Sequence, residues 1–329
     1  MKTVFRALLA LGLILAVVCL PERLCRLLNQ DELTDEMYRR REAYYTGVIE
    51  LWQIDCFEGG TGSRTQWLKN AVGAFEKKHN GVFINVNSVS PLLAEQLLDS
   101  GDRQADMISF GAGITVDRAK LESLEAQTDT LFPFLGPVCF SQAIPWCMGA
   151  YCVIGETENW GKDGFTDKRG AVYSLGIAPK AGYDPFQALT RADLTRELSF
   201  RQGTAQEMFD LYAGGRVRSL VGTQRDLYRV LARQNRGAMR EGAVTFLEEY
   251  NDLFQFIGIF HTQDEKKMSM MQTFVSFLLE KEQQDALGEI GMFPVRNDAA
   301  PVYTSADMQE VWEKLRQAAP RCVSSLWTS

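Results

Sequence analysis

The sequence predicts an α/β fold built on a mainly parallel sheet. Three observations support this prediction. Short segments alternate apolar and polar residues as strands do, helical segments with capping residues lie between these strand candidates, and glycine-rich turns follow the strand candidates. The chain has 329 residues, which is enough for two domains of ordinary size. Its mean hydropathy of −0.16 is typical of a globular protein.

The N-terminal segment has the composition of an export signal. Two basic residues, Lys2 and Arg6, flank the start of an uncharged apolar run over residues 7–20, which is short for a membrane span. We expect residues 1–21 to be a signal peptide or an uncleaved signal-anchor whose basic end stays inside. The charge-rich residues 22–45 then form a tether. The chain is therefore expected outside the cytoplasm, attached to the cell membrane.

Residues 47–113 predict strand, helix, strand, helix and strand in that order. Ser63 and Gln66 have capping-box spacing at the start of the first helix. In sheets of this kind ligands bind beyond the carboxyl ends of the strands, so the loops at 55–63 and 110–113 belong to the expected binding edge. The strands are expected at 48–54, 82–86 and 106–110, and the helices at 63–80 and 91–98.

The rest of the chain continues the alternation of strands and helices. Thr223 and Asp226 repeat the capping-box spacing, and Gly214–Gly215 ends the helix before them. Extended segments are expected at 145–156, 217–221 and 253–260, and helices at 184–198, at 204–213, from Thr223, from about Asp264, and around Val311.

The segment over residues 51–64, LWQIDCFEGGTGSR, is the most informative one for function. It places Trp52, Asp55 and Glu58 after a strand, then glycines, then a capped helix start. Glycines let backbone N–H groups approach a ligand, an indole offers a flat apolar face, and carboxylates accept hydrogen bonds from hydroxyls. These features suit a polyol, although the helix start also suits a carboxylate or phosphate. A capped turn without any ligand is the structural alternative.

Charge and cysteine content argue against a nucleic-acid-binding or metal-binding protein. The net charge of −7 and the isoelectric point of about 5.1 supply no basic face for nucleic acid. The seven cysteines show no metal-binding spacing and no evident disulfide framework, so we expect buried or unpaired thiols and no metal site. Pairing of Cys139 with Cys147 or Cys152 stays open.

Enzyme chemistry finds little support in the sequence. The two histidines, His79 and His261, stand apart from any nucleophile or metal-binding motif, and no nucleophile elbow or phosphate-binding loop occurs. Asp55 and Glu58 could act as a glycosidase pair, but acceptance of hydroxyl hydrogen bonds explains them more simply. We expect a protein that is not an enzyme and uses no cofactor.

Several segments in the same order resemble the family 1 extracellular solute-binding proteins, which include the maltose-binding protein. The resemblance covers roughly residues 47–296, and the segments before them do not follow the usual lipoprotein start. The segments that carry it are LWQIDCFEGGTGSR, NAVGAFEKKHNGV with INVNSV, QADMISFG, IPWCMGAYCVIG, RSLVGTQRDLYRV, NDLFQFIGI and FVSFLLEKEQQDALGEIGMF.

The resemblance implies a type II periplasmic-binding-protein-like clamp of two α/β lobes. Residues 46–146 plus 256–296 are expected to form lobe 1, and residues 147–255 plus 297–329 lobe 2. The chain is expected to cross between them near Pro145–Gly149, Phe254–Gly258 and Pro294–Asn297.

The same resemblance implies a ligand site between the lobes. Its expected ligand-binding residues are Trp52, Asp55, Glu58, Thr61, Phe110, Gly111, Trp146, Tyr151, Arg225, Asp252 and Phe293. The structural alternatives stay open: hinge packing for Trp146 and Phe293, strand core for Tyr151, a turn cap for Asp252, and a surface ion pair with Asp226 or Glu248 for Arg225.

The implied function is that of the extracytoplasmic substrate-binding component of an ABC importer. Closure of the clamp would bury a small polar ligand, a sugar first and an anionic solute second, and the closed form would dock on permease subunits. A membrane-tethered sensor or adaptor that keeps the clamp but has no transport role is the alternative.

Overall fold

The computed structural model describes most of the chain after residue 43. The described residues are 44–54, 62–100, 105–111, 114–124, 129–155, 171–175, 200–238, 242–246, 250–318 and 320–322. The chain separates into two compact units, Met1–Thr46 and Gly47–Ser329, and the elements below belong to the second. The expected signal or anchor segment lies outside the described residues. Within those residues, no helix is both long and apolar enough to cross a membrane.

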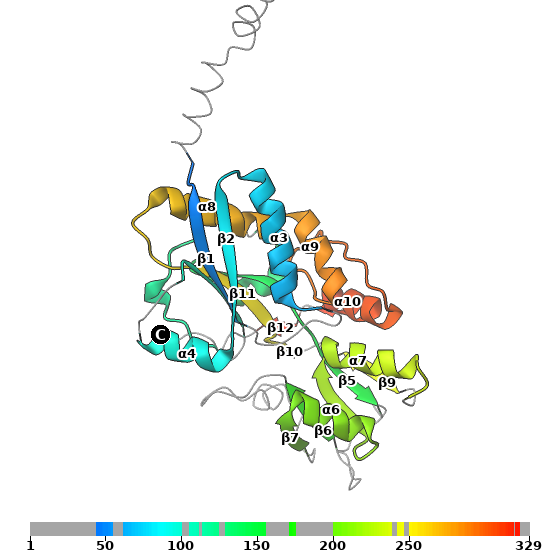
Figure 1. Cartoon of the computed structure of the whole chain (residues 1–329). Helices are drawn as coiled ribbons and strands as arrows, with labels where there is room; N and C mark the ends of the chain where they lie inside the picture. The colour runs from blue at the N-terminus through cyan, green and yellow to red at the C-terminus, as the bar shows by residue number, and fades with distance from the viewer. Residues whose placement is uncertain are drawn as a thin grey trace, which may run out of the picture. The chain divides into compact units, whose positions relative to one another are not determined.

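The first sheet has five strands in the order β2-β1-β3-β11-β4 (Figure 1). β1 pairs in parallel with both β2 and β3, whereas β11 runs antiparallel to β3 and β4. β4 therefore runs in the same direction as β3. The strands are β1 (Gly47–Ile54), β2 (Val82–Val89), β3 (Met107–Gly111), β4 (Ala143–Met148) and β11 (Phe254–Ile259).

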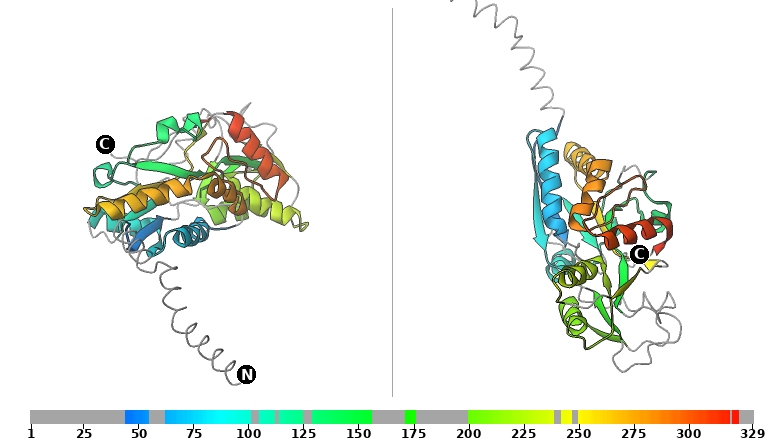
Figure 2. Two further views of the ribbon diagram at one scale, coloured as in Figure 1. Left: turned by 90° about the horizontal axis from the view of Figure 1, so that it is seen from above. Right: turned by 90° about the vertical axis from the view of Figure 1, so that its right-hand side faces the viewer.

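Two helices far apart in the sequence share a core beside this sheet. α3 (Arg64–Lys78) packs against β2, α8 (Glu265–Leu278) packs against β11, and the two helices contact each other (Figures 1 and 2). The ring of Phe75 lies edge-on to Phe274, with 5.1 Å between centroids, because apolar residues at helical spacing face inward on both helices.

The predicted N-cap of α3 is confirmed, and the predicted capping box is only half formed. The Ser63 Oγ accepts a hydrogen bond from the Gln66 backbone N at 3.1 Å. The Gln66 side-chain amide, however, donates to Asn70 Oδ1 at 3.0 Å, one turn further along the helix. A pair at positions i and i+4 on an exposed helix face competes with the return bond to the cap.

The second sheet also has five strands, in the order β7-β6-β8-β5-β9. β6 is parallel to β7 and β8, while β5 runs antiparallel to β8 and β9. The strands are β5 (Tyr151–Gly155), β6 (Ala171–Leu175), β7 (Phe200–Thr204), β8 (Ser219–Thr223) and β9 (Ala243–Phe246).

Two helices pack together beside the second sheet. α6 (Ala205–Ala213) contacts β6, β7 and β8, and α7 (Gln224–Gln234) contacts β8 and β5 (Figure 1). The guanidinium of Arg229 lies 3.7 Å from the ring centroid of Phe209, which joins the two helices. The capping box predicted at Thr223 and Asp226 is confirmed in both directions.

The α/β prediction is confirmed, and the remaining differences are local. The single extended segment expected at 145–156 is two strands, since Gly149–Ala150 interrupts it. The strands β6, β7 and β9 were not predicted, and the helix expected at 184–198 lies outside the described residues. The other elements are α4 (Pro91–Ser100), α9 (Lys281–Ala286), α10 (Ala306–Ala318), the short 3-10 helices η1 (Arg118–Lys120), η2 (Pro133–Val138) and η3 (Leu287–Ile290), and the two-residue strands β10 (Tyr250–Asn251) and β12 (Arg321–Cys322).

Candidate functional site

A two-residue link joins the carboxyl edges of the two sheets. β4 ends at Met148, opposite Phe254 at the start of β11, so Met148 lies at the carboxyl edge of the first sheet. β5 begins at Tyr151, opposite Thr223 at the end of β8, so Tyr151 lies at the carboxyl edge of the second. Ligands of α/β sheets bind beyond carboxyl edges, and this link therefore marks the candidate site.

Two further segments lie against this link. The Gly149 backbone N donates to Leu253 O at 2.7 Å, and the Asn251 side-chain amide donates to Gly149 O at 3.0 Å. On the other side, Met148 and Phe293 exchange backbone hydrogen bonds of 2.9 Å in both directions. The passage from the first sheet to the second, the return near residue 252 and the segment near residue 293 therefore form one bundle of extended chain.

Buried side chains tie this bundle together. The Tyr151 hydroxyl donates to Asp252 Oδ1 at 2.6 Å, which joins the outgoing and the returning segments. Gln224, the first residue of α7, accepts from the Ala150 backbone N at 3.0 Å and donates to the Met292 sulfur at 3.3 Å. These bonds fix the geometry of the link between the two sheets.

A polar network lies buried at the carboxyl edge of the first sheet. Gln255, which is 0% exposed, accepts from Arg64 Nη1 at 2.6 Å. Its amide nitrogen donates to Ile54 O at 3.1 Å and to Ser109 Oγ at 3.0 Å. The indole nitrogen of Trp146 donates to the same hydroxyl at 3.0 Å. One glutamine thus connects the ends of β1 and β3 and the start of α3 to the returning strand β11.

Arg64 is an unusual residue for its position. It is the first residue of α3, it is 1% exposed, and the positive end of the helix dipole disfavours a cation there. Burial of a guanidinium is costly unless acceptors surround it, and Gln255 supplies one of them. Burial raises the pKa of the nearby Cys147 thiol to about 12, and the Arg64 charge opposes that rise.

The structure places the predicted site residues at different depths, and their contact with a ligand stays a prediction. Gly111 lies opposite Gln255 at the sheet edge, and Trp52 lies two residues before the end of β1. Arg225 is half-buried in the first turn of α7, where its backbone N donates to Thr223 Oγ1 at 3.3 Å. Three predicted residues, Asp55, Glu58 and Thr61, lie outside the described residues.

Three of the predicted aromatic residues make packing contacts, which for Trp146 and Phe293 fit the alternative of hinge packing. Trp146 stacks on Trp67 with 5.1 Å between centroids, Phe110 stacks on Phe256 at 5.6 Å, and Phe293 stacks on Trp312 at 5.9 Å. All three predicted residues are fully buried in these stacks. Tyr151 and Asp252 are likewise buried and bonded to each other, which fits the strand-core reading of Tyr151.

The sequence reasoning missed Arg64, Ser109, Gln224 and Gln255. Arg64 was treated only as part of a helix start, and Gln224 only as part of a cap. A signal did exist for Gln255, because it is the single polar side chain inside the apolar run over residues 253–260. A polar residue in a wholly buried strand needs hydrogen-bond partners, and these partners define the network.

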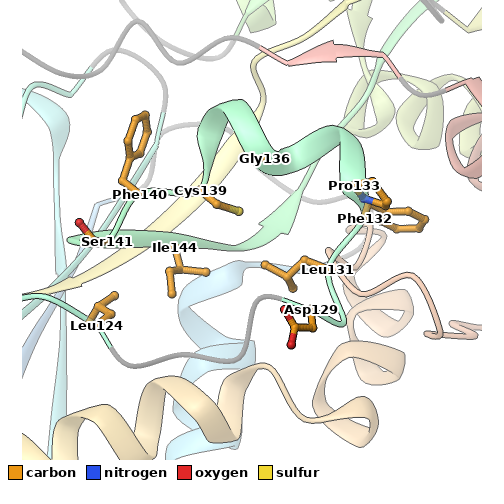
Figure 3. Close-up of a pocket in the computed structure, with 10 residues that line it drawn as sticks. All are labelled: Leu124, Asp129, Leu131, Phe132, Pro133, Gly136, Cys139, Phe140, Ser141 and Ile144. Carbon is orange, nitrogen blue, oxygen red and sulfur yellow. The ribbon is translucent and has the colours of Figure 1, made fainter.

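A cavity lies between η2 and the start of β4 (Figure 3). It has a volume of about 590 Å³, and none of the eight predicted site residues that the structure describes lines it. Its walls come from η2, the start of β4 and the segments before them: Leu124, Asp129, Leu131, Phe132, Pro133, Gly136, Cys139, Phe140, Ser141 and Ile144.

Comparisons with known proteins find similar solved structures. No protein-family model matches the sequence, and no curated protein matches it. Among solved structures, the chain is similar to the GacH receptor of Streptomyces glaucescens GLA.O, solved unliganded and with acarbose, with a TM-score of 0.59 and 13% identity over 85% of this chain and 88% of that one.

Two other solved structures are also similar to this chain. An ABC transporter substrate-binding protein from Bradyrhizobium japonicum USDA 110 has a TM-score of 0.52 and 14% identity, over 85% of this chain and 94% of that one. Iron-bound HitA from Pseudomonas aeruginosa has a TM-score of 0.51 and 13% identity, over 82% and 99%. The fold is that of the two-lobed periplasmic binding proteins. At these identities the likeness shows the fold, and it does not single out family 1.

Proposed function

We propose that the chain is the extracytoplasmic substrate-binding component of an ABC importer, which captures a small polar ligand between its two lobes. The observation that carries the proposal is the link at Gly149–Ala150, which joins the carboxyl edges of two separate sheets. A ligand that touches both edges stabilises the closed arrangement, since the open arrangement offers contacts from one edge only. Solved proteins of this fold that bind acarbose and iron support a binding role over a catalytic one.

A sugar is the first candidate ligand. Residues 55–61 follow β1 in the sequence and precede the capped start of α3. Their sequence supplies two carboxylates and two glycines, and Trp52 lies just before them. Carboxylates accept hydrogen bonds from several hydroxyls at once, which suits a polyol.

An anionic ligand is the second candidate, and Arg64 favours it. A buried guanidinium at the start of a helix combines a forked donor set with backbone N–H groups that point outward, and both suit carboxylate or phosphate oxygens. A solvent-exposed arginine would not favour an anionic ligand in this way.

A thermal-shift screen of the purified full-length chain tests the binding role. The probes are maltose, glucose, glucose 6-phosphate, γ-aminobutyrate, citrate and inorganic phosphate, each at millimolar concentration. A ligand present at about 100 times its Kd adds roughly 2.7 kcal/mol of stability and should raise the Tm by roughly 5–10 °C. If none of these probes moves the Tm, the proposed ligand classes are wrong.

Two matched pairs of variants separate the candidates. Glu58→Gln keeps the side-chain shape and should remove a sugar-induced shift, whereas Glu282→Gln on the exposed start of α9 should not. Arg64→Lys keeps the charge but loses the forked donor set, so it should weaken an anion-induced shift about tenfold or more in apparent affinity. Arg236→Lys at an exposed position is its control.

The transport role and the membrane attachment need cellular measurements. Deletion of the gene should lower uptake of the ligand that the screen identifies; unchanged uptake would favour the tethered sensor. The proposed attachment is a signal-anchor over residues 1–21, with residues 22–45 as its tether. A mature N-terminus found by mass spectrometry between residues 21 and 45 would show that the signal is cleaved instead.

A further inference from the structure

Two cysteines that are far apart in the sequence come together in the fold. Cys139 caps the C-terminal end of η2, and Cys322 is the second residue of β12. β12 packs against η2, so the chain near residue 322 lies on the segment that ends at Cys139. Cys139 is half-buried and Cys322 is 5% exposed. Both are thiols in this structure.

The electrostatics of the two thiols agree with this proximity. Burial raises the pKa of Cys139 to about 11 and that of Cys322 to about 12. After burial, the next contribution to the rise at Cys322 is the negative charge that Cys139 would carry. Charges interact in this way only at short range, whereas the shifts at Cys147 and Cys152 have burial as their largest cause and no contribution from another cysteine.

We propose that Cys139 and Cys322 form a disulfide that fastens the C-terminal strand to η2, while Cys147 and Cys152 remain thiols. The oxidant is an external disulfide, such as a thiol oxidoreductase or oxidised glutathione. Two S–H bonds break, one S–S bond forms between the two cysteines, and the two electrons and two protons pass to the external disulfide, which leaves as two thiols.

The surroundings give an oxidant a route to one sulfur and not to the others. Cys139 lines the cavity of about 590 Å³ (Figure 3), so a small disulfide can approach it through that space. Cys147 and Cys152 are fully buried within β4 and β5 and do not line that cavity, so an external disulfide has no comparable route to them.

The disulfide has a consequence for the hinge. β12 pairs in parallel with β10, with Cys322 opposite Asn251. Asn251 bonds in turn to Gly149 in the link between the sheets. A covalent bond at Cys322 therefore holds the strand that borders the returning segment, and it closes a loop long enough to stabilise the folded chain considerably.

Peptide mapping of the wild-type full-length chain tests the proposal. The purified, reduced chain is incubated with oxidised glutathione, unfolded in urea with iodoacetamide, and then reduced and labelled with N-ethylmaleimide. Trypsin cleaves after Arg321, and chymotrypsin cleaves after Phe140 and Trp146, so the cysteines at 139, 147 and 322 fall on different peptides. We expect N-ethylmaleimide on Cys139 and Cys322, iodoacetamide on Cys147 and Cys152, and a linked peptide before reduction.

Variants and heating provide a second measurement. Reductant should lower the Tm of the oxidised wild-type chain by roughly 5–10 °C, and it should have no such effect on Cys139→Ser or Cys322→Ser. Cys147→Ser is the matched control and should keep both the linked peptide and the sensitivity to reductant. Iodoacetamide on both Cys139 and Cys322, separate glutathione adducts on each, or a bond from either to another cysteine overturns the proposal.

Because pairing inside the cell also rests on the proposed extracytoplasmic function, the two are tested separately. The incubation with oxidised glutathione depends only on the fold and decides the pairing. The same mapping on chain taken directly from cells decides the compartment. A pair that forms in the tube but is reduced in cells leaves the pairing standing and contradicts the location.

Discussion

Replacement of Gln255 is expected to destabilise the body far more than a glutamine substitution usually does. Its side chain makes three buried hydrogen bonds, to Arg64, Ile54 and Ser109. A bond to a charged group contributes about 1.5–3 kcal/mol and each neutral bond about 1 kcal/mol. Gln255→Ala should therefore lower the free energy of unfolding by about 4 kcal/mol.

Urea unfolding followed by tryptophan fluorescence measures this loss. With an m value of roughly 3 kcal/mol/M, the midpoint should fall by about 1 M or more. Gln255→Met keeps the length of the side chain but removes all three bonds, so it should retain most of the loss and separate hydrogen bonding from cavity formation.

Gln66→Ala is the matched control for this prediction. Gln66 is exposed, and its amide makes one bond to Asn70 on the same helix face. Its replacement should cost less than about 0.5 kcal/mol. If Gln255→Ala and Gln66→Ala unfold at the same urea concentration, the hydrogen bonds of Gln255 do not connect β11 to β1, β3 and α3 as described.

Three further predictions concern the caps, the hinge and an exposed ion pair. Thr223→Ala removes the hydroxyl half of the α7 capping box and should cost about 1 kcal/mol in urea unfolding, while Thr223→Ser should cost much less. Tyr151→Phe removes the bond to Asp252 and leaves a buried carboxylate with one donor fewer; we expect a loss of about 1–3 kcal/mol, and a variant as stable as the wild type contradicts this reading. The hydrogen bond from Arg296 lowers the pKa of Asp298, so its contribution is present above the unfolded pKa of about 3.9 and is lost as the pH falls through the folded value. Because Asp298 is solvent-exposed, Asp298→Asn should cost only a few tenths of a kcal/mol at pH 7 and nothing at pH 2, as thermal unfolding at the two pH values can show.

Local patterns in the sequence were sufficient for most elements of the first sheet. The alternation at Val82, Ile84 and Val86 and the N-cap at Ser63 are local signals, and each predicted an element that the structure contains. β9 had no comparable signal. It is a four-residue strand whose pairing partner, β5, precedes it by about ninety residues, so its formation depends on tertiary context that local propensity does not encode.

The candidate site was less predictable than the fold. The expectation that functional residues gather at carboxyl edges rests on strand direction, which follows from the α/β alternation, and contact of these edges with a ligand stays a prediction. Depth was not predictable in the same way: the sequence left open whether Trp146 and Phe293 contact a ligand or pack the hinge, and in the structure they stack on Trp67 and Trp312. Their partners come from helices distant in the sequence, and no periodicity within one segment indicates such a stack.

Solution scattering of the full-length chain, with and without a saturating probe from the thermal-shift screen, tests the clamp most directly. We predict a smaller radius of gyration in the presence of the probe, because the ligand draws the two carboxyl edges together around the link at Gly149–Ala150. An identical scattering profile at saturation, with the Tm raised by binding, would contradict closure of two lobes over the ligand.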